Sequence, residues 1–120
     1  MKILVVDDSK LARLSLIKTV KKLEPSAEFI EADNGAVAVE LFKQESPNVV
    51  FLDLTMPVMD GFEALIEIIK INPDAQVVVV SADIQEQARN RVLEYGAKNM
   101  CPKPINDEKM QNIFMHDLLI

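Results

Sequence analysis

The sequence has few of the residues that form covalent cross-links, metal cages or membrane anchors. Its 120 residues include one cysteine, one histidine, three glycines and no tryptophan. One cysteine excludes an intramolecular disulfide framework and a cysteine-rich zinc site. No apolar run approaches the ~20 residues that a membrane-spanning helix needs, so we expect no insertion into a membrane.

Positive charge is also scarce. Lys and Arg number 13 against 19 Asp and Glu, which gives a formal charge of -6 with the histidine neutral. Binding to nucleic acid depends on a basic surface, so this balance argues against nucleic acid as a partner. Met1 leads directly into a strand-like run, without the leader of a secreted protein. We expect one soluble, cytoplasmic domain over residues 1–120.

Three β-branched apolar runs, at 3–6, 49–52 and 77–80, show no alternation with polar residues. This pattern is typical of strands that are buried on both faces, as in a parallel sheet covered by helices. Two weaker runs, at 27–32 and 98–101, are more mixed and predict edge strands.

Helical patterns separate these runs. Ala12, Leu16, Val20 and Leu23 recur at helical spacing before Pro25. Residues 36–42 form a second pattern, which places Val37 and Leu41 on one face.

Capping signals predict three further helices. Asp60 with Glu63, and Asp83 with Glu86, have the spacing of a capping box. The first of these helices should run toward residue 72 and the second toward Gly96. Asn106 is expected to cap a last helix, whose apolar residues are Met110, Ile113, Phe114 and Leu118.

Five β-then-α units in a row predict an α/β fold with a parallel sheet and right-handed crossovers. With the three continuous runs central and the two weak runs at the edges, the strand order is 2-1-3-4-5. The expected architecture is therefore a flavodoxin-like three-layer sandwich.

Ligands in such sheets bind beyond the carboxyl ends of the strands. Four predicted strands deliver polar groups there: Asp7 and Asp8, Asp53, Ser81, and Lys103 with Pro104. Converging carboxylates repel one another, and a hard divalent cation such as Mg²⁺ relieves that repulsion. A carboxylate nucleophile, a metal, an ammonium and a hydroxyl are the parts that phosphoryl transfer needs.

These motifs, in this order, resemble the response-regulator receiver domain of two-component signalling. The matching segments are Val6-Asp7-Asp8-Ser9, Asp53-Leu54-Thr55-Met56-Pro57, Met59-Asp60-Gly61, Ser81-Ala82 and Lys103-Pro104. They span essentially the whole chain, without an appended output domain. The resemblance therefore implies a stand-alone regulator of the chemotaxis or phosphorelay type.

The resemblance implies a role for each matching residue. Asp53 would accept a phosphoryl group from a histidine kinase or phosphotransfer protein. Asp7, Asp8, Asp53 and the backbone carbonyl of Thr55 would hold Mg²⁺ or Mn²⁺. Ser81 and Lys103 would bind the phosphoryl group, and Ala82 would leave space for it. The Lys103–Pro104 bond would be cis.

Phosphorylation would then reshape the surface of the fourth helix, fifth strand and fifth helix for binding of a downstream protein. The family often has an aromatic switch residue three positions before the lysine, where this chain has Met100. Methionine lacks the two distinct ring positions of an aromatic side chain. Thr55 and Asp83 occupy variable places that could tune how fast the phosphoryl group is lost.

Other functions fit the sequence less well. A pseudo-receiver that binds partners without phosphorylation would not need the acidic set, Ser81 and Lys103. A haloacid-dehalogenase-like phosphatase would have a second aspartate two residues after Asp53, where Thr55 stands. We expect a phosphoacceptor that acts on itself, not an enzyme with a separate substrate, and either a monomer or a weak dimer.

Several of these residues, taken singly, could have a purely structural role. Asp7 and Asp8 could cap the first helix, and Asp60 is a better cap than metal ligand. Cys101 should pack in the core, and His116 should be exposed. The apolar residues 118–120 either pack the last helix or form a partner surface.

Overall fold

Five parallel strands form one sheet in the order β2-β1-β3-β4-β5. The computed structural model describes residues 1–82 and 84–119. The strands are β1 (Lys2–Val6), β2 (Glu28–Ala32), β3 (Val49–Leu52), β4 (Val77–Ser81) and β5 (Asn99–Pro102). Fold class, strand order and the choice of edge strands are confirmed, and β5 lies one residue later than expected.

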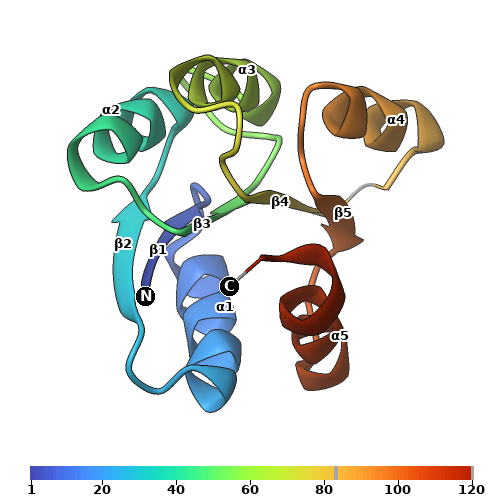
Figure 1. Cartoon of the computed structure of the whole chain (residues 1–120). Helices are drawn as coiled ribbons and strands as arrows, with labels where there is room; N and C mark the ends of the chain where they lie inside the picture. Colours follow the sequence, from blue (N-terminus) through green and yellow to red (C-terminus); the bar gives the residue numbers. More distant parts are fainter. Residues whose placement is uncertain (83, 120) are drawn as a thin grey trace.

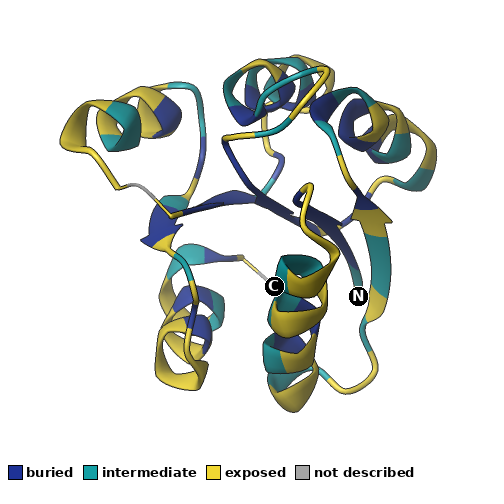
Figure 2. Cartoon of the chain, turned by 180° about the vertical axis from the view of Figure 1, so that it is seen from behind, coloured by how far each residue is buried: buried dark blue, intermediate teal, exposed yellow. Residues whose placement is uncertain are grey.

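Helices cover both faces of the sheet (Figure 1). They are α1 (Lys10–Leu23), α2 (Gly35–Glu45), α3 (Gly61–Ile71), α4 (Glu86–Glu94) and α5 (Asp107–Asn112), which a π-helical turn η1 (Ile113–Asp117) extends. The helices α1 and α5 lie on one face, and α2, α3 and α4 lie on the other. Because the central strands lie between two helical layers, β1, β3 and β4 are the most deeply buried part of the molecule, whereas the edge strand β2 is mostly exposed or half-buried (Figure 2).

Alternate strand residues point to opposite faces and build two separate cores. Leu4, Leu52 and Val79 pack under α2, α3 and α4, together with Leu65 and other helix residues. On the opposite side, the strand residues Ile3, Val5, Phe51, Val78 and Val80 meet α1 and the α5–η1 segment. The continuous apolar runs are explained by this burial on both sides.

Side-chain caps start four of the helices. Ser9, Asn34, Asp60 and Asn106 each accept a hydrogen bond from the backbone N–H three residues later. The predicted caps Asp60 and Asn106 are therefore confirmed. Capping of α1 by Asp7 or Asp8 is wrong, because the hydroxyl of Ser9 accepts the bond from the Ala12 N–H, at 3.2 Å.

Two helix predictions need correction. The helix α4 starts at Glu86, after an extended Gln85 that makes no side-chain cap. Glu86 is therefore the first helical residue and cannot serve as the third position of a capping box; Asp83 lies outside the described residues. Val37 is exposed on α2, because this helix packs through Ala38, Val39 and Phe42 instead.

Candidate functional site

The polar residues of the site stand at the carboxyl ends of four neighbouring strands. Asp7 directly follows β1, Asp53 follows β3, Ser81 ends β4, and Lys103 follows β5. Since parallel strands all end at the same edge, the sheet brings these residues together from distant parts of the sequence.

Three carboxylates cluster at this edge. Asp7, Asp8 and Asp53 each present an oxygen within 4.8 Å of the others. Asp8 is exposed, whereas Asp7 and Asp53 are only 5% and 6% exposed. Oxygen donors in this density match the ligand preference of Mg²⁺, which is typically held by one or two carboxylates and keeps several waters. The donor set therefore fits a hard divalent cation.

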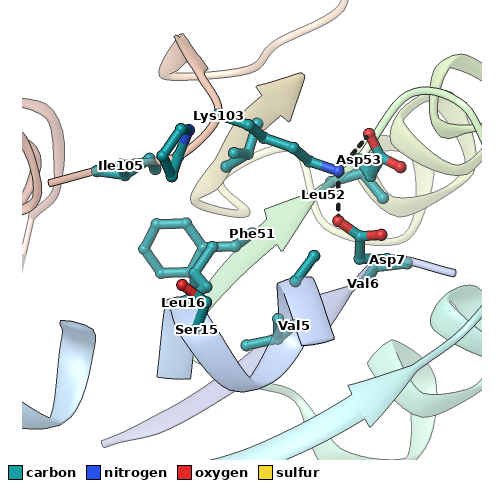
Figure 3. A pocket seen from close by; sticks show the side chains of 13 residues that line it. Val5, Val6, Asp7, Ser15, Leu16, Phe51, Leu52, Asp53, Lys103 and Ile105 are labelled. Atoms are coloured by element: carbon teal, nitrogen blue, oxygen red, sulfur yellow. Dashed lines mark ion pairs between the residues drawn. The ribbon is translucent and has the colours of Figure 1, made fainter. Parts of the chain in front are cut away.

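Lys103 provides the positive charge next to these acids. Its Nζ lies 2.5 Å from Oδ2 of Asp7 and 3.4 Å from Oδ1 of Asp53 (Figure 3). One ammonium offsets one of the three negative charges. The cluster keeps an excess of negative charge, which a divalent cation would neutralise.

The environment of the site changes the pKa of both Asp53 and Lys103. Burial raises the pKa of Asp53 and the Asp7 carboxylate raises it further, while the Lys103 ammonium opposes both. Burial alone would lower the pKa of Lys103, but the hydrogen bond to Asp7 and the charges of Asp53 and Asp7 outweigh it, so this pKa is raised. Lys103 is therefore a permanent cation at neutral pH.

Backbone contacts fix the two buried carboxylates. Oδ1 of Asp7 accepts from the Ser9 N–H at 2.9 Å, and Oδ1 of Asp53 accepts from the Leu54 N–H at 3.0 Å. The carbonyl of Asp7 accepts from Nη1 of Arg13 at 2.7 Å. Arg13 thus positions Asp7, a role that was not predicted, since the arginine lies a turn into α1 and its partner is set by the tertiary fold.

Two glycines anchor the loop between Asp53 and α3. A Cβ atom on Gly61 would collide with the carbonyl of Asp53, and one on Gly35 would collide with the carbonyl of Met59. Backbone bonds accompany both contacts, from Gly61 N to Leu54 O and from Gly35 N to Met59 O, each at 2.9 Å. The glycines are required here for close approach.

The remaining predicted site residues fall into two groups. Thr55 and Ser81 line one surface cleft between α3 and α4, and Ala82 is exposed beside it. Met100 lies apart, 1% exposed, in the core under α2, α3 and α4. The Lys103–Pro104 peptide bond is cis. Cys101 is buried and His116 is exposed, as predicted.

A family model of the response regulator receiver domain matches residues 3–114. The chain belongs to this family. Receiver domains are signalling phosphoacceptors of two-component systems, and the acidic cluster of this one is compatible with Mg²⁺. The resemblance in the sequence is thereby confirmed at the level of the family.

This receiver domain is similar to chemotaxis proteins. CheY of Bacillus subtilis is 38% identical over 109 residues, which cover 91% of this chain and 90% of that protein. CheY of Thermotoga maritima is 36% identical over 109 residues, which also cover 91% of this chain and 90% of that protein. A crystal structure of the CheX-CheY-BeF3-Mg²⁺ complex from Borrelia burgdorferi has a TM-score of 0.88 at 31% identity, covering 96% of this chain and 87% of that one.

Across residues 1–82 and 84–119, every helix is too short or too polar to cross a bilayer.

Proposed function

We propose that this receiver domain accepts a phosphoryl group on Asp53 in a Mg²⁺-dependent reaction. The observation that carries the proposal is the juxtaposition of three carboxylates within 4.8 Å of one another with an ammonium that reaches two of them. Of these carboxylates, Asp53 is buried at the end of a central strand, where a loop fixed by glycines on both sides holds it.

In the proposed reaction, a carboxylate oxygen of Asp53 attacks the phosphorus of a phosphohistidine or a small acyl phosphate. A new P–O bond forms, the bond from phosphorus to the donor breaks, and the donor leaves with the electron pair. Lys103 turns from Asp7 toward a phosphoryl oxygen, and the Ser81 hydroxyl donates to another. Ala82, without a larger side chain, leaves room for the group.

The metal is assigned to the acidic cluster. Asp8 and Asp53 would bind Mg²⁺, or Mn²⁺, through their side chains, Asp7 through a bound water, and Thr55 through its backbone carbonyl. The ion would neutralise negative charge on the transferring phosphoryl group. Support comes from the Borrelia burgdorferi CheY, whose complex contains Mg²⁺ together with BeF3, an anion that imitates a phosphoryl group.

The output surface is assigned to α4, β5 and α5. A chain of hydrogen bonds links α4 and β5 to the η1 turn that extends α5: Arg89 donates to Met100 O at 2.7 Å and to Asn99 Oδ1 at 3.1 Å, and Asn99 donates to Asp117 Oδ2 at 2.7 Å. Met100 itself is buried and has no aromatic ring to move. We assign the coupling between α4 and β5 to the Arg89 side chain instead.

The remaining features follow from the same proposal. Residues 1–120 act in the cytoplasm as a receiver domain, as a monomer or weak dimer. Its phosphoryl donor is a histidine kinase or phosphotransfer protein, and its downstream partner is a protein, not nucleic acid. The net charge of -6 and the 90% coverage of the Bacillus subtilis CheY support this assignment.

The test is incubation with a small acyl phosphate and Mg²⁺, followed by intact-mass spectrometry. We expect an adduct of one phosphoryl group that disappears in Asp53→Asn and on chelation of the metal. Asp74→Asn is the matched control, because Asp74 is exposed in the turn before β4, at the amino end of the strand and away from the site. In this variant the adduct should form normally.

An adduct that survives Asp53→Asn would move the phosphoacceptor elsewhere. A folded wild-type protein that forms no adduct with any acyl phosphate would instead support the pseudo-receiver alternative, an interaction module that works without phosphorylation.

A further inference from the structure

A cavity of about 190 Å³ lies directly beneath the two buried carboxylates, on the α1 side of the sheet (Figure 3). Its floor is formed by Val5, Phe51, Val80 and Ile105, which are all buried. The half-buried Leu16 of α1 forms part of its wall. Asp7, Asp53 and Lys103 are shared with the phosphoacceptor site, but the apolar part of the cavity has no role in the phosphoryl chemistry proposed above.

Water is a poor occupant for the apolar part of this space, away from Asp7, Asp53 and Lys103. A buried water needs two to four polar partners, whereas a cavity lined by apolar side chains stays dry and accepts an apolar guest. In the described part of the chain, every buried side-chain nitrogen or oxygen already has a hydrogen-bond partner. A cavity of roughly 150 Å³ holds benzene, so this one has room for a ring with a small substituent.

The polar end of the cavity selects the charge of a guest. Asp7, Asp53 and Lys103 line it where it meets the phosphoacceptor site. An anion would lie against two carboxylates, and an organic cation would compete for them with both the Lys103 ammonium and the divalent cation assigned to the acidic cluster. A neutral molecule with one hydrogen-bond donor avoids both costs, because the donor reaches a carboxylate oxygen and the ring stays in the apolar part.

The geometry points to a binding site for neutral, ring-sized apolar molecules that carry one hydrogen-bond donor. Entry is from the α1 side, where Ser15 lines the mouth and is exposed. The guest packs between Leu16, Phe51 and Ile105.

Occupancy of this site is coupled to the phosphoacceptor through Lys103. The Lys103 side chain lines the cavity and ends between the two carboxylates (Figure 3). A guest that packs against this side chain holds the ammonium on Asp7, whereas a phosphoryl group requires it to turn away. The guest and the phosphoryl group therefore favour different positions of one lysine, and the coupling is negative. This second step rests on the proposed function, while the binding itself does not.

Indole is a suitable probe, since it is neutral and has a ring and a single N–H donor. Titration into the metal-free protein should shift the methyl NMR signals of Val5, Val80 and Ile105 and raise the melting temperature. Ala12→Leu fills the cavity from α1 and should abolish both effects. Ala36→Leu, an equally half-buried alanine in the first turn of α2, is the matched control and should bind indole normally. Ser15→Met fills the mouth from the next turn and replaces Ala12→Leu if that variant does not fold.

Coupling is measured with Mg²⁺ and BeF3. Saturating indole should weaken BeF3 binding about fivefold, at the low end of typical coupling, and Mg²⁺–BeF3 should weaken indole binding by the same factor. Unshifted methyl signals at millimolar indole, or equal binding by the cavity-filled variant, would overturn the site. Binding of indole with unchanged BeF3 affinity would overturn the coupling. Failure of Asp53 to be phosphorylated would overturn only the proposed function, because the metal-free titration does not involve it.

Discussion

The two faces of the sheet are packed in different ways. Under α2, α3 and α4, the side chains form one continuous core, in which Leu65, Ile68 and Val79 have no exposed surface. Under α1 and α5, the core is interrupted by a cavity below Asp53 and Lys103. Asp53 and Lys103 therefore lie above a gap in the packing of this face, where the lysine side chain has space to change position, whereas Thr55 and Ser81 line the cleft between α3 and α4.

The helices of the two faces are also tied together differently. On the first face, the guanidinium of Arg91 in α4 stacks over the ring of Phe62 in α3, with 4.1 Å to the ring centroid. On the second face, α1 and α5 are joined at the surface by an ion pair between Lys22 and Asp107, at 3.0 Å. Arg91, Lys22 and Asp107 are all exposed, so each contact is worth about 1 kcal/mol or less and the two ties are of similar strength.

The largest expected effect is on the free energy of unfolding, and it comes from truncating one core side chain on each face. Ile68→Ala removes a fully buried side chain from the three-helix face and should cost about 4 kcal/mol in the free energy of unfolding. Ile105→Ala, beside the cavity, should cost about 2 kcal/mol, because that side chain already lacks neighbours on one side. Urea denaturation measures both. Equal costs would contradict the difference between the faces.

The second effect concerns the charge above the cavity. The pKa of Asp53 is raised mainly by burial, so folding is favoured when this group is protonated. Its contribution to stability is present below the ordinary pKa of 3.8 and is lost as the pH rises through the folded-state value. Asp53→Asn should therefore stabilise the metal-free protein by about 1 kcal/mol at pH 7, a common size for a single substitution.

This gain should shrink as the pH falls and vanish below pH 3.8. Denaturation curves over a range of pH values, with a chelator present, provide the measurement. The exposed control Asp74→Asn should leave the curves unchanged, and a gain in Asp53→Asn that persists at low pH would show that the buried charge is not its cause.

A smaller effect is expected in the loop that follows Asp53. Val58 is 84% exposed and has a φ of 68°, a conformation that is strained for a β-branched residue. Val58→Asn should raise the free energy of unfolding by about 1 kcal/mol, since Asn tolerates this region. Val37→Asn, at an exposed helical position, tests the same exchange without a positive φ and should give no gain. Chemical denaturation of both variants decides whether the strain is real.

The smallest effect belongs to the tie between α1 and α5. A double-mutant cycle on Lys22 and Asp107, each changed to Ala, should give a coupling below about 0.5 kcal/mol, because both side chains are mostly exposed. The coupling should disappear in 1 M salt. A larger, salt-insensitive coupling would show that the two-helix face is held more firmly than its packing suggests.

The sequence was informative wherever a signal is local. The buried strands, the caps Asp60 and Asn106, and the meeting of Asp7, Asp53 and Lys103 at one edge all follow from short patterns and from sheet topology. The start of α4 and the buried face of α2 were wrong, since tertiary packing overrides weak local preferences.

Other features depend on contacts between distant segments. Arg13 on the Asp7 carbonyl, the Arg89–Asn99–Asp117 hydrogen bonds and the cavity under Lys103 involve residues that no short pattern connects. The apolar residues at the end of the chain differ in their burial. Leu118 is buried against the core and Leu119 is exposed, while Ile120 lies outside the described residues.

The glycine anchors on either side of the loop from Asp53 to α3 have a consequence for the evolution of the chain. Gly61 abuts the carbonyl of Asp53, and Gly35 abuts that of Met59, so the loop is held at both ends by backbone contacts. An inserted or deleted residue would break one contact or the other. This loop should therefore tolerate no insertion or deletion, although exposed positions within it, such as Val58, can accept other side chains.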